Sequence, residues 1–260
     1  MHHNYVDQFA HGNSTVHRLD ARAKLLAVLA YTTVLISFDR YEIVGLAPMF
    51  LLPLVGLYAG RIPAAFAVKR LLILSPFIAM LCLASPLFDS RAHALGIGPW
   101  HVAVAGGWLT AGDIFLKFAL GVLALTAMMC TTPFALLLEA MRKGGMPKLL
   151  AMQLGFLYRY IFVLIDQAMR VRRARDFRGA AVAGASRRLA AVGGIVGSLF
   201  VRTLERSERI HVAMCARGYR GEPHSLEQLR FTSADAIFLA AVAIYLALCR
   251  AGFAILVNHV

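Results

Sequence analysis

Charged side chains are scarce in this sequence, and acidic ones are the scarcest. Asp, Glu, Lys and Arg make up 16% of the 260 residues, whereas soluble proteins average roughly 25%. Apolar residues make up 59%, and 14 acidic residues oppose 27 Lys and Arg, which gives a formal net charge of +13. A soluble domain of this size does not need so much apolar surface, so the composition argues against a soluble protein.

Recognisable catalytic motifs are missing as well. No glycine-rich loop is followed by Lys and Ser or Thr, which excludes ATP binding in the P-loop manner. The sequence has no His-Glu-x-x-His motif, no convincing Ser/His/Asp set and no signal-peptide pattern at its N-terminus. None of the cysteines has the spacing of a metal or redox site: Cys82, Cys130, Cys215 and Cys249. We therefore expect a chain that is not an enzyme and that has no cofactor of its own.

Long apolar runs are the main feature that is present. Several approach the roughly 20 residues that a helix needs to cross a bilayer. They predict an all-α, polytopic helical membrane protein with about five spans. Pro48 and Pro53 interrupt the second span, and because proline removes a backbone hydrogen bond, we expect that span to be bent or broken. The five expected spans are 21–38, 43–60, 71–88, 112–132 and 234–257.

The basic residues predict the orientation of the chain. With the N-terminus in the cytoplasm, segments 1–24, 61–70 and 133–233 carry 23 of the 27 Lys and Arg. This bias follows the positive-inside rule. We therefore expect a multi-pass protein of the bacterial cytoplasmic (inner) membrane, with its N-terminus inside and its C-terminus outside.

Charges inside apolar runs need a separate explanation. Lys117 and Arg250 lie near the ends of spans, where snorkelling of the side chain to the interface accounts for them. Residues 149–169 are apolar and long enough for a sixth span, but Arg159 and Asp166 would be costly at the middle of the bilayer. We therefore expect residues 149–169 to form a cytoplasmic helix under or against the membrane.

The chain accordingly divides into three parts. A four-span region (1–132) is followed by a cytoplasmic module (133–233) and a C-terminal span (234–260). Residues 142–230 hold 17 Lys and Arg against six Asp and Glu, which suits anionic membrane lipid or an acidic protein. We do not expect nucleic acid as a partner, because this basic block is tied to the membrane and contains no nucleic-acid-binding module.

A short stretch outside the expected spans has the pattern of strands. In residues 92–111, Val102 and Val104 alternate with small or polar residues and lead into Gly106 and Gly107. This alternation predicts a small β-hairpin on the outer side.

Within the basic block, one hexapeptide pattern occurs twice, 42 positions apart. The first arginine motif is Ala174-Arg175-Asp176-Phe177-Arg178-Gly179, and the second is Ala216-Arg217-Gly218-Tyr219-Arg220-Gly221. In both motifs a glycine falls where a helix would stop, at Gly179 and at Gly218 or Gly221. The repeat suggests one surface presented twice, which suits a twofold partner with two equivalent acidic grooves.

Arginine suits docking because its planar fork of donors pairs with carboxylates at two points. Lipid headgroups also attract arginine near a membrane, but lipid does not require the same residue order twice. We therefore predict that the motifs dock a protein partner. The residues assigned to docking are Ala174, Arg175, Arg178, Ala216, Arg217, Gly218 and Arg220.

The segment between the motifs has helical periodicity over residues 187–217. Gly193 and Gly197 offer small residues for a close crossing of two long helices, each ending in one arginine motif. The alternative is an ordinary packed helix.

These features resemble the transmembrane T component of energy-coupling factor (ECF) importers, and within it the cobalt/nickel type (CbiQ/NikQ). Besides the two arginine motifs, the similarity lies in His11-Gly12-Asn13-Ser14 and in His17-Arg18-Leu19-Asp20-Ala21-Arg22-Ala23-Lys24-Leu25-Leu26. It covers essentially the whole chain. The resemblance implies that Arg175 and Arg217 dock into grooves on two P-loop ATPase subunits. In the first motif, Asp176 departs from the glycine of the family pattern.

The resemblance also implies a coupling mechanism. Two partner ATPases bind the ATP, and the helices that end in the arginine motifs transmit their motion to a membrane S component, which binds the substrate, cobalt or nickel. His2 and His3 are weak candidates for metal binding in this chain, because an N-terminal amine, two amides and an imidazole can form a square-planar site. A plain cytoplasmic tail is the simpler interpretation.

Two other functions stay open. One is a membrane enzyme or enzyme-anchoring subunit with a basic cytoplasmic surface, and the other is a self-sufficient permease with polar residues facing each other at mid-membrane. An enzyme keeps its activity when purified alone, whereas a coupling subunit copurifies with ATPases.

Overall fold

The computed structural model describes residues 9–10, 12, 14–38, 43–88, 92–97, 100–177, 185–220 and 229–258. Contacts divide the chain into two compact units. The membrane unit comprises His2–Ala140 and Leu229–Val260, and the arginine unit comprises Met141–Gln228. Some residues that the sequence analysis singled out lie outside the described residues: His2, His3, Arg178, Gly179 and Gly221.

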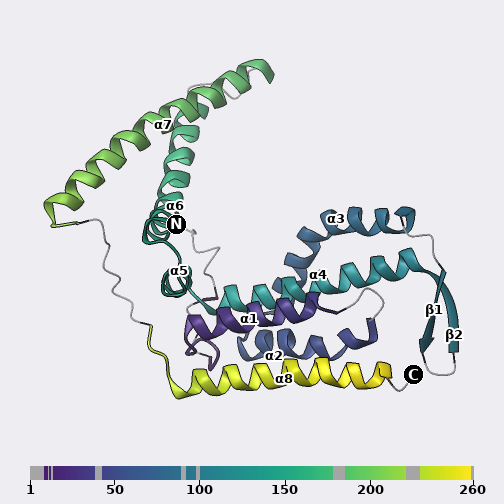
Figure 1. Cartoon of the computed structure of the whole chain (residues 1–260). Helices are drawn as coiled ribbons and strands as arrows, with labels where there is room; N and C mark the ends of the chain where they lie inside the picture. Colours follow the sequence, from purple (N-terminus) through teal and green to yellow (C-terminus); the bar gives the residue numbers. More distant parts are fainter. Residues whose placement is uncertain are drawn as a thin grey trace. The chain divides into compact units, whose positions relative to one another are not determined.

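The membrane unit is built from helices and one hairpin. Helix α4 contacts α1, α2 and α3, while α1 also contacts α8, and Figure 1 shows these helices. Its elements are α1 (Ala21–Ile36), the short 3₁₀ helices η1 (Ile43–Leu46) and η2 (Pro48–Phe50), α2 (Leu51–Ala59), α3 (Ala64–Phe88), β1 (Ala92–Ile97), β2 (Trp100–Ala105), α4 (Gly106–Thr131), α5 (Phe134–Lys143, except its last three residues) and α8 (Ser233–Asn258).

Four of the described helices are long and apolar enough to cross a membrane. They cover Ala64–Ser85, Gly107–Thr131, Lys148–Asp176 and Ser233–Gly252, with a shorter apolar helix at Pro48–Ala59. The predicted class, an all-α polytopic membrane protein, is confirmed. The span expected at residues 71–88 begins earlier, at Ala64. The helix Lys148–Asp176 contains residues 149–169, whose cytoplasmic placement stays a prediction based on Arg159 and Asp166.

The second apolar segment is broken, as its prolines predict. It consists of η1, η2 and the nine-residue α2 in place of one helix. Because Pro53 has no N–H, the carbonyl of Met49 lacks its usual helical donor. The Tyr31 hydroxyl of α1 donates to that carbonyl at 3.0 Å, and the Tyr245 hydroxyl of α8 donates to the carbonyl of Pro48. Helix α1 therefore supplies the donor that Pro53 removes, while the Pro48 carbonyl, which already accepts from the Leu51 N–H, gains a second donor from α8.

In helix α3, a serine hydroxyl supplies a hydrogen bond that a proline cannot make. Pro76 leaves the carbonyl of Leu72 without its helical N–H donor. The Ser75 hydroxyl donates to that carbonyl at 2.9 Å. The helix continues to Phe88, because a side chain replaces the missing backbone donor.

The predicted hairpin is confirmed between α3 and α4. Strands β1 and β2 pair antiparallel, with Ala92 opposite Ala105 and Ile97 opposite Trp100. The pair is a minor β element in an otherwise helical described chain.

The core of the membrane unit lies where α1, α4 and α8 meet the broken segment. Tyr31, Leu46, Met49 and Leu120 are all 0% exposed in this cluster. The buried Tyr31 therefore contributes both apolar area and the hydroxyl that the broken segment needs.

The arginine unit contains two long helices, α6 (Lys148–Asp176) and α7 (Ala185–Ala216). Helix α6 has 29 residues and is therefore about 43 Å long at 1.5 Å per residue. Contacts place all but the end of α5 in the membrane unit, with Leu137 and Ala140 buried, whereas the sequence analysis assigned α5 to the module 133–233.

Removal of the Tyr31 hydroxyl tests the proposed repair of the broken segment. We expect Tyr31→Phe to lower the free energy of unfolding by about 1–3 kcal/mol, because the Met49 carbonyl then stays buried without a donor. Denaturant unfolding in detergent measures the change, and Tyr58→Phe, at a site 88% exposed, is the control. In a Pro53→Ala background, the backbone N–H restored at position 53 can serve Met49, and the cost should shrink. An equal cost in both backgrounds would contradict this explanation.

Candidate functional site

Helices α6 and α7 run antiparallel, which separates the two arginine motifs (Figure 1). At one end, the Tyr219 hydroxyl lies 2.6 Å from the sulfur of Met152, near the start of α6. At the other end, Arg175 and Arg202 line the same hollow between the helices. Met152 and Arg175 lie 23 positions apart on α6, which corresponds to about 35 Å. The arginine unit therefore presents its two motifs at opposite ends of a helical pair.

The second arginine motif ends α7 with a defined cap. Ala216 is the last helical residue, and Gly218 has φ +83°, in the left-handed region. The N–H of Gly218 donates to the carbonyl of Cys215, and that of Tyr219 donates to the carbonyl of Met214, both at 3.0 Å. This pair of hydrogen bonds is the Schellman motif, which favours glycine at the left-handed position. Of the two predicted stops, Gly218 or Gly221, the structure shows the one at Gly218, and Arg217 just before it is exposed.

The first arginine motif has a different backbone. Helix α6 continues through Asp176, and Phe177 caps it with right-handed angles (φ −65°, ψ −21°). Phe177 is 91% exposed, and Arg175 is half-buried. Asp176 stands where the second motif has glycine, and a residue with a Cβ avoids the left-handed cap. The expectation of one surface presented twice is therefore wrong at the level of backbone conformation.

The other described residues assigned to docking are exposed, so a partner can reach them: Ala174, Ala216, Gly218 and Arg220. Their docking role stays a prediction.

Gly193 and Gly197 do not make the expected close crossing between α6 and α7. A Cβ added at either glycine would meet no described heavy atom within 4 Å.

A buried polar cluster joins the starts of α1 and α8 to the end of α4. We call it the Lys24 cluster: Asp20, Lys24, Thr131, Thr132 and Asp235, all at most 6% exposed. The Lys24 ammonium donates to the Thr131 carbonyl at 2.8 Å and to the Thr132 hydroxyl at 3.3 Å. The Asp235 carboxylate accepts from the Asp20 N–H at 2.7 Å. Buried charge is tolerated here because each charged group has hydrogen-bond partners.

The segment that precedes α1 is folded around one histidine. His17 Nε2 lies 2.8 Å from the Phe9 carbonyl, and His17 Nδ1 lies 2.7 Å from the Ser14 hydroxyl. Since a carbonyl only accepts, Nε2 carries the proton and Nδ1 accepts from Ser14. Gly12 is required beside this ring, because a Cβ there would come within 2.8 Å of it. Gly12, Ser14 and His17, which belong to the segments that resemble the family, therefore shape the chain just before α1.

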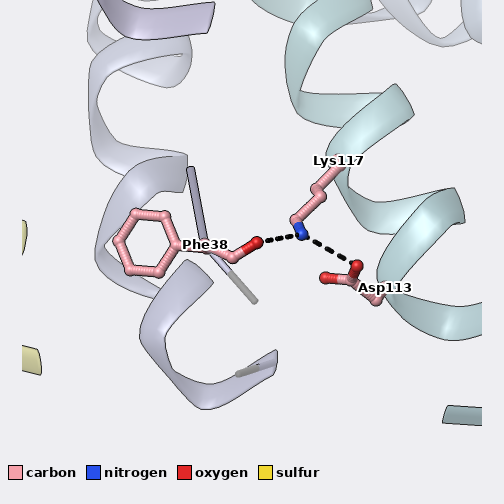
Figure 2. A network of polar contacts seen from close by, with 3 residues as sticks. All are labelled: Phe38, Asp113 and Lys117. Atoms are coloured by element: carbon pink, nitrogen blue, oxygen red, sulfur yellow. Dashed lines mark hydrogen bonds and ion pairs between the residues drawn. The ribbon is translucent and has the colours of Figure 1, made fainter. Parts of the chain in front are cut away.

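A second polar cluster, the Lys117 cluster, lies at the other end of α1 (Figure 2). The Lys117 ammonium is 2.9 Å from the Asp113 carboxylate and donates to the Phe38 carbonyl at 2.7 Å. The guanidinium carbon of Arg250 lies 5.2 Å from the centre of the Phe38 ring. Both charges therefore have partners within the protein, and snorkelling alone does not account for them.

Together the two lysines act reciprocally on α1 and α4. Lys24 of α1 reaches the last residue of α4, and Lys117 of α4 reaches the carbonyl of Phe38, just beyond the end of α1. A cation near a helix C-terminus stabilises the carbonyls that have no intrahelical donor. The antiparallel pair is therefore tied at both ends.

These features define a class: a polytopic helical membrane protein that carries two separated arginine motifs on an antiparallel pair of long helices. The sequence pattern of the CbiQ family, described as "Cobalt transport protein", matches residues 12–228. The chain belongs to the CbiQ family.

Characterised relatives agree in length with the chain. The "Energy-coupling factor transporter transmembrane protein EcfT" of Lactococcus lactis subsp. cremoris is 26% identical over 257 residues, which cover 94% of this chain and 96% of the relative. The protein of the same name from Thermosediminibacter oceani is 29% identical over 255 residues and 90% and 92% of the two chains. That from Bacillus subtilis is 27% identical over 230 residues and 83% and 84% of the two chains.

Sequence reasoning missed the structural roles of Lys24, Asp235 and Asp113. For Lys24 and Asp235 the partners are remote, since Asp20 and Asp235 are 215 positions apart and Lys24 and Thr131 are 107 apart. Asp113 instead pairs with Lys117 four positions later, a helical spacing that the sequence does show. The available signal was a charged residue within an apolar run, which favours an internal partner as much as snorkelling. For Lys24 and Asp235 the sequence does not show which residue that partner is.

Replacement of Lys24 tests the buried cluster. We expect Lys24→Met to lower the free energy of unfolding by about 3 kcal/mol, because the end of α4 loses two charge-assisted donors. Thermal unfolding in detergent measures this loss. Lys69→Met, at an exposed position of α3, is the matched control, and an equal shift in both variants would contradict the role of Lys24.

Substitution of Gly218 tests the cap of the second arginine motif. We expect Gly218→Ala to destabilise the end of α7 by about 1 kcal/mol, because an alanine at this φ is strained. A Cβ there meets no heavy atom within 4 Å, so the backbone alone causes the cost. Hydrogen exchange at Gly218 and Tyr219 should accelerate in Gly218→Ala, less in Gly218→Asn, and not in Gly197→Ala. Equal acceleration in all three variants would exclude this cap as the cause.

Proposed function

We propose that this chain is the transmembrane coupling subunit of an ECF-type importer, and that it hydrolyses no ATP itself. The observation that carries the proposal is the pair of arginine motifs at opposite ends of α6 and α7. Membership of the CbiQ family and the names of the relatives, which are transmembrane proteins of ECF transporters, support it.

Two P-loop ATPase subunits are the proposed partners of the motifs. Arg175 and Arg217 lie about 35 Å apart along the helical pair, a separation that suits two docking sites better than one. Each arginine enters an acidic groove on one ATPase, where its planar fork pairs with carboxylates. When the ATPases bind ATP and move relative to each other, the two docked helix ends move with them.

The exposed apolar faces of α6 and α7 supply a surface for the proposed S component. Leu157, Ile161, Val196 and Phe200 are between 42% and 67% exposed. Large exposed apolar patches mark binding or membrane surfaces. In this proposal the S component holds the substrate, and movement of the helices changes its orientation.

Cobalt is the first choice of substrate and nickel the second. The family description "Cobalt transport protein" supports this order. We place the chain in the bacterial cytoplasmic membrane with its N-terminus inside and its C-terminus outside. The arginine unit then lies on the side where ATP is available, as the distribution of Lys and Arg supports.

Loss of either docking arginine should separate the chain from its ATPases. We expect Arg175→Ala and Arg217→Ala to fold normally but to bind the ATPases at least about tenfold more weakly, because a charged pair at the interface is lost. Copurification with the ATPases and uptake of radioactive cobalt and nickel measure the two effects.

Arg209→Ala is the matched control, since Arg209 is an exposed arginine of α7 outside both motifs. If the Arg175→Ala/Arg217→Ala double variant assembles and transports like the control, the proposed function is wrong.

A further inference from the structure

The ends of the helical pair differ in more than backbone conformation. Near the first arginine motif, a hollow of about 570 Å³ lies between α6 and α7. Arg170 and Arg175 of α6 line it together with Arg202 of α7. Only Arg175 belongs to a motif that the sequence reveals. The other two arginines reach the same hollow because α6 and α7 run antiparallel beside it.

Small residues leave the space that the hollow occupies. Ala174 on α6 and Gly194 and Ser198 on α7 line it beside the arginines. No acidic residue is among the described residues that line it. Its walls therefore combine positive charge with room for side chains from a partner.

Among the described residues, none supplies an opposite charge to the three arginines. Across the described residues, no carboxylate lies within ion-pair distance of Arg170, Arg175 or Arg202. Three cations around one hollow repel one another, and a ligand that supplies at least two negative charges relieves that repulsion. The charge distribution therefore indicates an anionic occupant.

An exposed aromatic side chain next to the hollow favours a protein as that occupant. Phe177 is 91% exposed and lies two positions after Arg175. Arginine and aromatic side chains are enriched among the residues that dominate protein–protein binding. The second motif differs, because Tyr219 turns back to contact Met152, whereas Arg217 is exposed.

We propose that Arg170 and Arg202 join Arg175 in a three-arginine docking site for an acidic segment, bearing at least two carboxylates, of the ATPase that engages the first motif. The proposal rests on the proposed function and adds two docking residues to it. It also makes the two ends of the helical pair non-equivalent: the first requires a cluster of carboxylates on its partner, whereas the second presents Arg217 beside a glycine cap.

Cross-linking in the assembled transporter tests this proposal. The full chain, coexpressed with its ATPase and S subunits, carries a photo-cross-linking residue either at Phe177, beside the first motif, or at Val212, one turn before the second. Both positions are exposed, at 91% and 67%. In the Arg170→Gln/Arg202→Gln variant, we expect the ATPase cross-link from position 177 to fall about tenfold and that from position 212 to persist.

Matched controls separate charge from position. Arg172→Gln/Arg209→Gln removes two exposed arginines that do not line the hollow, and it should leave both cross-links unchanged. Arg202→Lys keeps the charge but loses the planar fork, so we expect a partial loss at position 177. Unfolding in detergent checks that every variant is folded.

Two outcomes would overturn the three-arginine site: an unchanged cross-link at position 177 in Arg170→Gln/Arg202→Gln, or an equal loss at both positions. If the cross-link is unchanged and less anionic lipid copurifies, the hollow binds a lipid headgroup instead. The proposed function survives each of these results if Arg217→Ala still loses ATPase, so the two proposals fail separately.

Discussion

The membrane unit depends on two lysines that each satisfy the end of the other helix. Lys24 of α1 donates to the final residue of α4, and Lys117 of α4 donates to the carbonyl that follows α1. In a low-dielectric environment an unsatisfied carbonyl is costly, and a cation beside a helix C-terminus is favourable. Because the two contacts lie at opposite ends, sliding of α1 along α4 breaks at least one of them. Tyr31, whose hydroxyl donates to the broken segment, lies between them on α1.

The arginine unit differs from the membrane unit in how much of its side-chain surface is exposed. Its helices keep large apolar side chains and several arginines exposed. Such surfaces suit contacts with other molecules. The chain thus combines a membrane unit whose buried charges have internal partners with a helical pair on which Arg170, Arg175 and Arg202 surround one hollow without an acidic residue among its described lining. This division suits the proposed coupling subunit.

Much of the fold was predictable, and the limits have physical causes. The apolar runs identified the membrane class, the prolines identified the break in the second segment, and alternation identified the hairpin, because each signal is local in sequence. The repeated motif predicted a helix stop at Gly218 or Gly221, and its assignment of Arg175 and Arg217 to docking stays a prediction. Arg202 was not predictable as a neighbour of Arg175, since only the antiparallel packing of α6 and α7 brings them to one hollow. The predicted close crossing at Gly193 and Gly197 was also not found, because small residues permit an approach without requiring one.

The amino-acid sequence alone determined that the chain enters a membrane, which segments are helical, where one helix must break and where α7 must stop. Those properties follow from apolar length, from the missing N–H of proline and from the left-handed freedom of glycine. The tertiary structure decided which carbonyl Lys24 and Lys117 each satisfy, how Asp235 meets the start of α1, and that Arg170, Arg175 and Arg202 share one hollow. Those properties depend on pairs of residues 79 to 215 positions apart, or on the packing of two helices. Hydrophobic periodicity and residue spacing in the sequence do not predict such pairs.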